Sequence, residues 1–413
     1  MSLYPLPPHR ERWLLWTLAG IQFTHILDFM IMMPLGPAFV RAFGISTQQF
    51  GFLVSAYTFS AGLSGLLAAS FVDRFDRRRV VLGAYAVFAL ATLACAFAPG
   101  YASLLAARCL AGMFGGILGA MVFTVIGDAI PFERRGRATG IVMASFSIST
   151  IAGVPLGLWI SQIAGWHGPF VFIAVLCAGF WWIGWRALPS LASHVAGDDR
   201  RAPSPMRTVL RDANHWRAWC FVALMMLSGF TVIPFITLYY TANVGIAESA
   251  IPLVYLFGGA CTFFTSRWFG RLADRHGKQR VYRWIAIGSL VPLFSTTHLP
   301  AAPLWIALVN STLFFVLVSG RMVPGMAMVT SAANPRLRGT FMSINSAIQS
   351  ASSGIASLIA GIIITTNPTG QLERYGWVGF IAMSATVCAM WLAGRVNPTD
   401  AQATSAEVAT RTP

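Results

Sequence analysis

This sequence of 413 residues has little charge. Only 10% of its residues are Asp, Glu, Lys or Arg, whereas 56% are hydrophobic. A soluble globule of this size needs more polar side chains than that to cover its surface. The composition therefore excludes an ordinary soluble protein and places the chain in a lipid bilayer.

The sequence also lacks the spacings that catalytic and metal-binding residues require. Its seven His and six Cys residues are scattered, and no nucleophile–base pair, metal-ligand cluster or phosphate-binding glycine loop appears. These absences argue against a membrane enzyme and against an ATP-driven pump. We expect no cofactor and no metal, and we interpret the cysteines as packing residues: Cys95, Cys109, Cys177, Cys220, Cys261 and Cys388.

The chain does not begin like a secretory leader. Its first residues, MSLYPLPPHRERW, are polar and contain no short apolar core with a small-residue cleavage site. We interpret this stretch as the cytoplasmic lead-in to a first membrane span.

Long apolar runs are what the sequence has in abundance. A helix needs about 20 residues to cross a hydrocarbon core of about 30 Å. Twelve runs meet this requirement, and they lie near residues 13–40, 48–72, 80–98, 101–127, 138–163, 168–188, 216–242, 250–270, 281–298, 302–331, 340–366 and 374–394.

The longest polar stretch divides these runs into two sets of six. Its Pro, Ser, Gly and charged residues, at 188–217, cannot lie in lipid. We predict an all-α integral membrane protein with twelve transmembrane helices in two pseudo-symmetric six-helix bundles. Its expected parts are a cytoplasmic N-terminus at 1–12, an N-terminal bundle at 13–188, a cytoplasmic linker at 189–215, a C-terminal bundle at 216–394 and a cytoplasmic tail at 395–413.

The net charge of +15 comes from Arg and Lys residues that lie in alternate loops. They gather before the first span and in every second loop after it, whereas the intervening loops carry only Arg41 and Arg374. This asymmetry is the positive-inside rule, so we expect both termini in the cytoplasm. The charge then reports orientation in the membrane, and we expect no nucleic-acid partner.

The two halves of the sequence repeat each other. VDRFDRRRV at 72–80 reappears as ADRHGKQRV at 273–281, and ARCLAGM at 107–113 pairs with GRMVPGM at 320–326. Membrane transporters use such repeated bundles to place a substrate site between two halves that rock against each other. Duplication alone could also build a scaffold, but a scaffold or receptor would not need charged residues inside the bilayer.

Several motifs resemble the major facilitator superfamily across nearly the whole chain. GRLADRHGKQR at 270–280 closely matches that family's loop signature, whereas the first copy, ASFVDRFDRRR at 69–79, has Ala69 and Asp76 in place of two glycines. Span 4 carries Arg108 and Gly112 in the family's Arg-x-x-x-Gly pattern, and SFSISTIAGVPLGLW at 145–159 resembles its antiporter signature. The chain is most similar to the twelve-span drug:proton antiporter and arabinose-efflux-like permease branch.

This resemblance implies a monomeric secondary transporter in the inner membrane of a bacterium. Its partners would be the lipid bilayer, protons and a small-molecule substrate such as a drug, sugar or metabolite. Efflux by proton antiport is the function that the antiporter-like signature favours. A facilitator or proton symporter that imports a sugar or an organic acid is the alternative.

Charged residues inside the spans are the candidates for coupling. Asp28 lies in an apolar stretch, HILDFMIMMPLGP, and an Asp at the bilayer centre costs about 2.5–3.5 kcal/mol on insertion scales. Helical geometry lets Thr24, His25 and Asp28 share one stripe, which we expect to face a central cavity. We predict that Asp28 carries the coupling proton, and that His25 is either its partner or a hydrogen-bonded interior histidine.

Two arginines inside spans could act on that proton or on a substrate. Arg108 in span 4 could hold Asp28 ionised, since a guanidinium cannot lose its charge in a protein. Arg321 in span 10 has the place equivalent to Arg108 if the two span motifs are aligned. It could bind an anionic substrate or pair with backbone carbonyls.

The loop motifs predict contacts at the cytoplasmic side. Asp73 can accept hydrogen bonds from a helix N-terminus, and Arg77 can reach Asp128 at the end of span 4. In the family such contacts latch the cytoplasmic side. Asp274, Arg275 and Lys278 would repeat the arrangement, unless these loops, with Arg74 among them, only fix the topology.

Span 5 has small residues at every fourth position. Ser145, Ser149, Gly153 and Gly157 predict a smooth ridge on which another helix packs closely, and Pro155 predicts a kink. The ridge could form the proton-tight contact of an exchanger or be ordinary small-residue packing.

Overall fold

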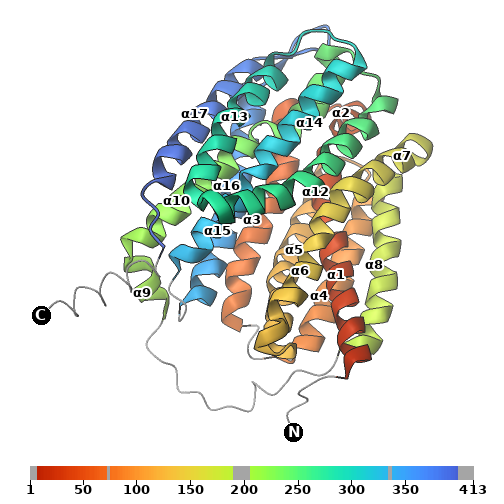
Figure 1. Ribbon diagram of the computed structural model, residues 1–413. Helices are drawn as coiled ribbons and strands as arrows, with labels where there is room; N and C mark the ends of the chain where they lie inside the picture. The colour runs from red at the N-terminus through yellow and green to blue at the C-terminus, as the bar shows by residue number, and fades with distance from the viewer. Residues whose placement is uncertain (1–6, 72–74, 189–204, 334–336, 399–413) are drawn as a thin grey trace, which may run out of the picture.

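The chain is almost entirely helical (Figure 1). The computed structural model describes residues 7–71, 75–188, 205–333 and 337–398. The N-terminal half consists of α1 (Pro8–Ile31), α2 (Gly36–Phe43), α3 (Thr47–Phe71), α4 (Arg77–Ala96), α5 (Tyr101–Ala129), α6 (Phe132–Ile148), the π-helical turn η2 (Ser149–Gly153), α7 (Val154–Ala164) and α8 (His167–Ala187).

The C-terminal half follows the same plan and adds a small hairpin. Its elements are α9 (Pro205–Arg211), α10 (Ala213–Phe230), η3 (Ile233–Phe235), α11 (Ile236–Tyr239), η4 (Tyr240–Val244), η5 (Glu248–Ala250), α12 (Ile251–His276), α13 (Lys278–His298), α14 (Leu304–Gly320), α15 (Met322–Ala332), α16 (Arg338–Ile363), β1 (Thr365–Thr366), β2 (Leu372–Glu373) and α17 (Tyr375–Ala393). The two strands pair antiparallel.

Each of the twelve predicted spans coincides with a helical segment. Eleven segments in the described part of the chain are long and apolar enough to cross a bilayer. The other is α13, which has 21 residues and begins with the basic sequence KQR. Its length of about 31 Å would still reach across a hydrocarbon core.

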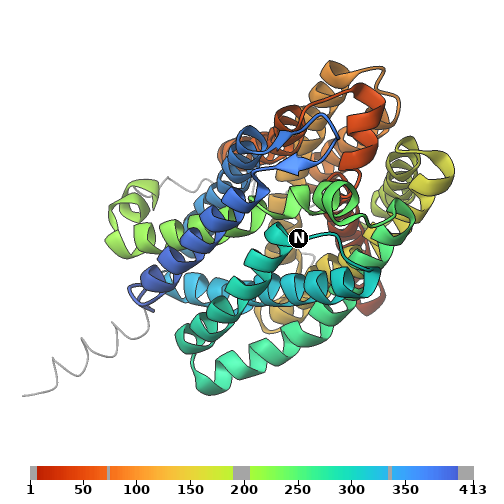
Figure 2. The same cartoon turned by 90° about the horizontal axis from the view of Figure 1, so that it is seen from above.

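The helices form two bundles that stand side by side, as the view in Figure 2 shows. Helices α1 and α3 to α8 pack on one another in the first bundle, and α10 and α12 to α17 in the second. α1 begins and α17 ends at the same end of the molecule (Figure 1). We call this the basic end, because the arginines at the starts of α4 and α6 lie there, and we call the opposite end the distal end.

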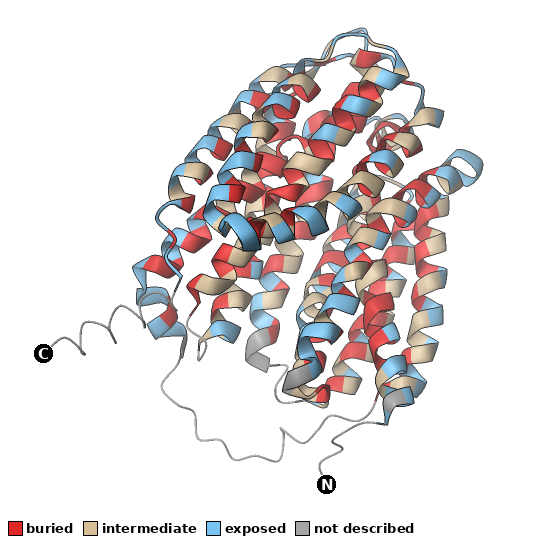
Figure 3. Ribbon diagram, viewed as in Figure 1, coloured by how far each residue is buried: buried red, intermediate tan, exposed pale blue. Residues whose placement is uncertain are grey.

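Exposed positions lie along the outer faces of the helices (Figure 3), and many of them carry large apolar side chains. Trp13, Leu90, Phe264 and Val291 are all more than half exposed. A soluble monomer rarely exposes apolar surface on this scale, whereas lipid tails solvate it well. The outer surface is therefore that of a protein embedded in a bilayer.

Prolines break the first and fifth spans. α1 ends at Ile31, Pro34 lies in the turn that follows, and Pro37 lies in the first turn of α2, so the predicted span 13–40 is two helices. In the fifth span, the π-helical turn η2 directly precedes α7, whose second residue is Pro155. A π-helical turn changes the backbone hydrogen-bond pattern locally, so the helix can continue past a proline that cannot donate a hydrogen bond.

Hydrogen bonds between the two halves lie toward the distal end in the described part of the chain. Arg41 of α2 binds both carboxylate oxygens of Glu248 in η5. The Thr47 hydroxyl donates to the carbonyl of Ile364 at 2.7 Å, and the Ser55 hydroxyl donates to that of Gly354 at 2.9 Å. The distal side is therefore the closed side of this conformation.

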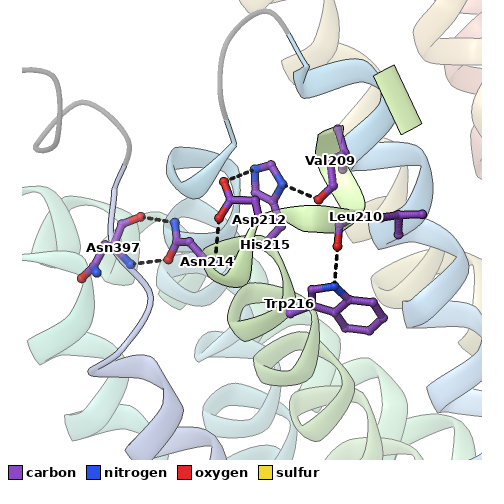
Figure 4. A network of polar contacts seen from close by, with 7 residues as sticks. All are labelled: Val209, Leu210, Asp212, Asn214, His215, Trp216 and Asn397. Carbon is purple, nitrogen blue, oxygen red and sulfur yellow. Dashed lines mark hydrogen bonds and ion pairs between the residues drawn. The ribbon is translucent and has the colours of Figure 1, made fainter. Parts of the chain in front are cut away.

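A polar junction ties the linker helix α9 and the chain after α17 to the start of α10 (Figure 4). The side chain of Asn214 exchanges two hydrogen bonds, of 2.8 and 3.0 Å, with the backbone of Asn397. Asp212 caps α10 by accepting from the Asn214 N–H, and the ring of His215 bonds the carbonyl of Val209. Helix α9, which precedes the second bundle, and the residues that follow α17 are thus both bonded to the start of α10.

Candidate functional site

A salt bridge between Asp28 and Arg108 lies inside the N-terminal half. Arg108 Nη1 is 2.8 Å from Asp28 Oδ2, and both side chains have an exposed fraction of 0%. Thr92 of α4 donates a hydrogen bond of 3.2 Å to Asp28 Oδ1, and Arg108 Nη1 also donates to the Asp28 carbonyl. Because the pair is neutral as a whole, the bundle can bury two ionised groups.

Aromatic rings cover this ion pair. The Arg108 guanidinium lies over the Tyr57 ring, 4.4 Å from its centroid, within the range of a cation–π interaction. Tyr57 stacks on Phe29 at 5.4 Å, and Phe29 lies 5.9 Å from Phe230 of α10. A chain of rings therefore runs from the ion pair to the C-terminal half.

The orientation predicted for the stripe on α1 is wrong for two of its three residues. Thr24 bonds the Tyr85 hydroxyl of α4 at 2.8 Å, and Asp28 bonds α4 and α5, so both face the interior of their own bundle. Helical periodicity fixes which residues share a face, but not which neighbour that face meets. His25 is half-buried near Tyr57, and its Nδ1 has no hydrogen-bond partner among the described residues.

Arg321 is buried in the C-terminal half among neutral groups. Its guanidinium donates to the hydroxyls of Thr386 at 2.8 Å, Ser228 at 2.9 Å and Ser289 at 3.4 Å. These residues come from α17, α10 and α13. Among the described residues the acceptors are therefore side-chain hydroxyls and not the backbone carbonyls that the sequence suggested as one possibility.

Arg321 does not occupy the place equivalent to Arg108, so that prediction is wrong. Arg108 lies two turns after α5 starts at Tyr101, whereas Arg321 lies after the last residue of α14, which starts at Leu304. At 1.5 Å per residue, Arg321 is about 15 Å nearer the basic end. Aligning the two short motifs shifted the repeat by nearly three turns.

The first loop motif forms the ion pair expected from it. Arg77 Nε is 3.1 Å from Asp128 Oδ2, and this pair joins α4 to α5 within one half. Asp76 caps α4 by accepting from the Arg78 N–H at 3.1 Å, which explains an Asp where the motif has glycine. Asp73 and Arg74 lie outside the described residues.

The second loop motif does not repeat this arrangement. Asp274 and Arg275 are exposed, and neither they nor Lys278 form an ion pair with any described residue. The reason is in the sequence, because no acidic residue ends α15 as Asp128 ends α5. Gly277 keeps the glycine of the motif and has a φ of 90°, a conformation that favours glycine.

The small-residue ridge of span 5 packs against α1. The Ser145 hydroxyl donates to the Ala19 carbonyl at 2.8 Å, and the Ser149 hydroxyl donates to the Phe23 carbonyl at 3.1 Å. One turn further on, a Cβ added to Gly153 would lie 2.9 Å from Leu27 Cδ1, so this position also needs a small residue. The fourth residue, Gly157, meets Ile31 of α1 in the same way.

Sequence reasoning missed the neutral partners of the buried charges. Thr92 and Tyr57 belong to apolar stretches with no charge to mark them, and the same is true of Ser228, Ser289 and Thr386. A hydroxyl every few turns is common in membrane helices, where it can bond its own backbone. Only the packing of the helices shows which hydroxyls meet an arginine.

The sequence matches known proteins over nearly its whole length. A family model described as Major Facilitator Superfamily matches residues 18–266 and 218–412. An uncharacterized MFS-type transporter, YwfA of Bacillus subtilis, is 24% identical over 366 residues, which cover 87% of this chain and 85% of the relative. A chloramphenicol resistance protein of Streptomyces lividans is 23% identical over 366 residues, which cover 86% of this chain and 90% of that protein.

Solved structures share the fold at low sequence identity. A D-xylose-proton symporter superposes with a TM-score of 0.76 at 15% identity and covers 94% of this chain and 98% of its own. A bacterial homologue of the human lysosomal transporter Spinster, in an inward-facing and occupied conformation, gives a TM-score of 0.74 at 17% identity. That match covers 95% of this chain and 98% of the homologue.

Proposed function

Because this chain belongs to the Major Facilitator Superfamily, we propose that it exports a small molecule by proton antiport and alternating access. At the coarser level it is a multi-pass secondary transporter and not an enzyme. The proposal adds a direction, a coupling ion and a residue that carries the proton. The single observation behind it is the fully buried Asp28–Arg108 pair.

Asp28 can couple the movement of protons to that of the substrate, because its charge decides what Arg108 binds. While Asp28 is ionised, Arg108 is held in the pair at 2.8 Å. A proton on Asp28 would neutralise the carboxylate and leave a buried cation without its counter-charge, which is strongly unfavourable. The bundle would then rearrange until Arg108 reached water, which its Nε and Nη2, without a partner among the described residues, can bind. In an antiporter this rearrangement would displace the exported compound, so that proton and substrate bind in turn.

The aromatic chain offers the means to transmit that change. Tyr57 touches Arg108 on one side and Phe29 on the other, and Phe29 faces Phe230 across the boundary between the halves. A shift of Arg108 would move Tyr57 and so alter the contact between the bundles. Rigid packing of this kind converts small displacements into discrete rearrangements.

We further propose that the basic end faces the cytoplasm of a bacterium. The arginines at the starts of α4 and α6 lie at this end, and cytoplasmic loops and the helix ends beside them carry the excess of Arg and Lys. The distal side, closed by the bonds of Arg41, Thr47 and Ser55, would then be the outer side, and this conformation would be open inward.

The substrate class we favour is a drug-like molecule with apolar surface. The similarity to a chloramphenicol resistance protein supports export of such a compound. The aromatic rings of Phe29 and Phe230 at the boundary between the halves suit apolar shapes of varied size. Import of a sugar or organic acid is the competing function.

Everted membrane vesicles test direction and coupling together. The interior is acidified by respiration, followed with a pH-sensitive acridine dye, and challenged with a panel of drugs and metabolites that includes chloramphenicol. We expect at least one compound to release protons from vesicles with the wild-type protein and none to do so with Asp28→Asn, while Glu373→Gln, which changes an exposed carboxylate, behaves as wild type. Proton release by the Asp28→Asn protein would contradict the assignment, and proton-driven uptake of one solute into cells would reverse the direction.

A further inference from the structure

Arg321 is a buried cation for which the sequence provides no counter-charge. Its side chain is 1% exposed. Between Ala213 and Ala393 the sequence contains three acidic residues, Glu248, Asp274 and Glu373, and all three are exposed on the surface. Inside the C-terminal bundle Arg321 is therefore unbalanced, whereas Arg108 in the other bundle is balanced by Asp28.

Such a charge is costly unless something neutralises it. A guanidinium cannot lose its proton in a protein, so the arginine cannot escape the penalty by becoming neutral. Hydroxyl groups solvate the cation but carry no net charge, and an uncompensated ion in a medium of low dielectric loses several kcal/mol of hydration energy. An anion from outside the chain would remove this penalty.

The groups around Arg321 also have donors to spare. Nε of Arg321 has no hydrogen-bond partner among the described residues, and neither has the hydroxyl of Tyr282, which is fully buried on α13. Its helix, α13, packs against α14 and α15, and Arg321 lies between these two helices. Ser289, which binds the guanidinium, lies two turns further along the same face of α13.

The hydroxyls that bind Arg321 are already engaged as donors. Ser289 donates to the Ala286 carbonyl at 2.7 Å, Thr386 donates to the Ala382 carbonyl at 2.8 Å, and the hydroxyls of Ser228 and Thr386 bond each other at 2.6 Å. Their lone pairs accept from the guanidinium. The local shortage is therefore of acceptors, and a site with unused donors and a net positive charge is complementary to an anion.

We propose that Arg321 Nε and the Tyr282 hydroxyl form a binding site for a small monovalent anion, while the hydroxyls of Ser228, Ser289 and Thr386 hold the guanidinium in position. Chloride and the carboxylate of an acid as small as acetate both have the required chemistry, whereas the six-carbon gluconate is too large for a buried site of this kind. The site lies nearer the basic end than the Asp28–Arg108 pair, so an anion would arrive from the arginine-rich side, where positive charge raises its local concentration. This site is independent of proton antiport.

Thermal unfolding of the purified full-length protein in detergent tests the site without a transport assay. Intrinsic tryptophan fluorescence follows unfolding while sodium chloride replaces sodium gluconate at constant ionic strength. We expect a saturable rise of the unfolding midpoint of roughly 2 °C or more, because a ligand that binds only the folded state stabilises it. Sodium acetate forms a second arm: a response at lower concentration than chloride assigns the site to a carboxylate, and the reverse assigns it to chloride.

Variants show whether Arg321 is the cause. Arg321→Gln should abolish the response and should unfold in gluconate no earlier than the wild type, since it removes an unbalanced charge. Arg267→Gln, which changes an exposed arginine of the same half, should respond as the wild type does. Should Arg321→Gln not fold, Tyr282→Phe and Ser228→Ala keep the charge and should raise the half-maximal anion concentration about fivefold to tenfold.

Two results would overturn the proposal. One is a wild-type protein whose unfolding midpoint does not distinguish chloride and acetate from gluconate. The other is an anion response that survives in Arg321→Gln, or that is unchanged in both Tyr282→Phe and Ser228→Ala.

Discussion

At the scale of single residues, the two bundles treat their buried arginines differently. Arg108 has a carboxylate, a threonine and an aromatic ring around it, whereas Arg321 has hydroxyls alone. The net charge around Arg108 changes when Asp28 takes up a proton, whereas the net charge around Arg321 stays constant. We therefore assign proton coupling to the N-terminal half and not to the C-terminal half.

Tyr57 should determine how well the ion pair is sealed. Tyr57→Ala removes the ring over Arg108 and opens the pair to water, so we expect proteoliposomes to leak protons and lose accumulation of substrate. Tyr57→Phe keeps the ring and loses only a weak hydrogen bond of 3.5 Å to the His25 carbonyl, so it should resemble the wild type. The measurement is the rate of dye-reported proton entry after a potential is imposed with valinomycin.

Equal leak rates in the two Tyr57 variants would contradict the sealing role. A leak that appears in Tyr57→Phe as well would point to the hydroxyl, and not the ring, as the important group.

Sequence alone could identify Asp28 and Arg108, because a charge in an apolar run is conspicuous. It could not identify Thr92 or Tyr57, since hydroxyls and rings are ordinary in a membrane helix. The alignment of the two seven-residue motifs also placed Arg321 at the level of Arg108, because a short motif does not define how deep a residue lies in the bilayer. Sequence periodicity does not predict which residues contact each other across helices, and these residues form the rest of the site.

At the scale of elements, α3 and α5 pack with their backbones almost in contact. A Cβ added to Gly116 would lie 2.2 Å from the carbonyl oxygen of Ala61, and one added to Gly112 would lie 2.3 Å from that of Tyr57. Small residues allow this approach, which is typical of helix pairs in membranes. The close approach holds Tyr57 at its place over Arg108.

Gly116→Ala should therefore destabilise the N-terminal bundle. Overpacking of a close contact costs about 1–3 kcal/mol. Gly127→Ala is the matched control on the same helix, since nothing lies within 4 Å of its added Cβ. We expect that control to be neutral or stabilising by up to about 1 kcal/mol, because alanine favours a helix over glycine.

Thermal unfolding of both glycine variants in detergent checks this prediction. The packing argument fails if Gly116→Ala unfolds at or above the wild-type midpoint, or if the two variants change it equally.

The positions of the spans were predictable at this scale, because runs of apolar residues are long and are bounded by loops with Gly, Pro and charge. The breaks inside the spans were less so. Pro34 and Pro155 each predict an interrupted helix, because proline removes a backbone hydrogen bond. The interruption could take the form of a kink, a turn or a π-helical segment. Here the chain ends α1 at Ile31 and inserts η2 into span 5.

At the scale of the whole molecule, the conformation is defined by where the halves meet. α3 packs along α16 and the fifth span along α12, and the polar bonds of this interface lie toward the distal end in the described segments. The Arg41–Glu248 pair is the charged bond among them. It must break if the distal side opens.

Charge reversal at this pair should favour distal opening. Both side chains are about half exposed, and such pairs contribute about 0–1 kcal/mol, so Glu248→Arg should shift the open population by up to about fivefold. The double variant Arg41→Glu with Glu248→Arg restores the attraction and should restore the wild-type distribution. Spin labels on cysteines introduced at Ser46 and Ala247 report the distance across the distal side.

An unchanged distance distribution in Glu248→Arg would show that the pair does not hold the distal side. A double variant that stays open would mean that the substitutions act through packing and not through charge.

The central claim is that the proton on Asp28 drives transport without being needed for movement of the substrate. It is tested most directly by comparing two fluxes of one exported compound in proteoliposomes: accumulation driven by a pH gradient, and exchange of labelled for unlabelled compound without a gradient. For Asp28→Asn the account predicts that accumulation is lost while exchange continues near the wild-type rate. Accumulation by Asp28→Asn at the wild-type level would contradict it.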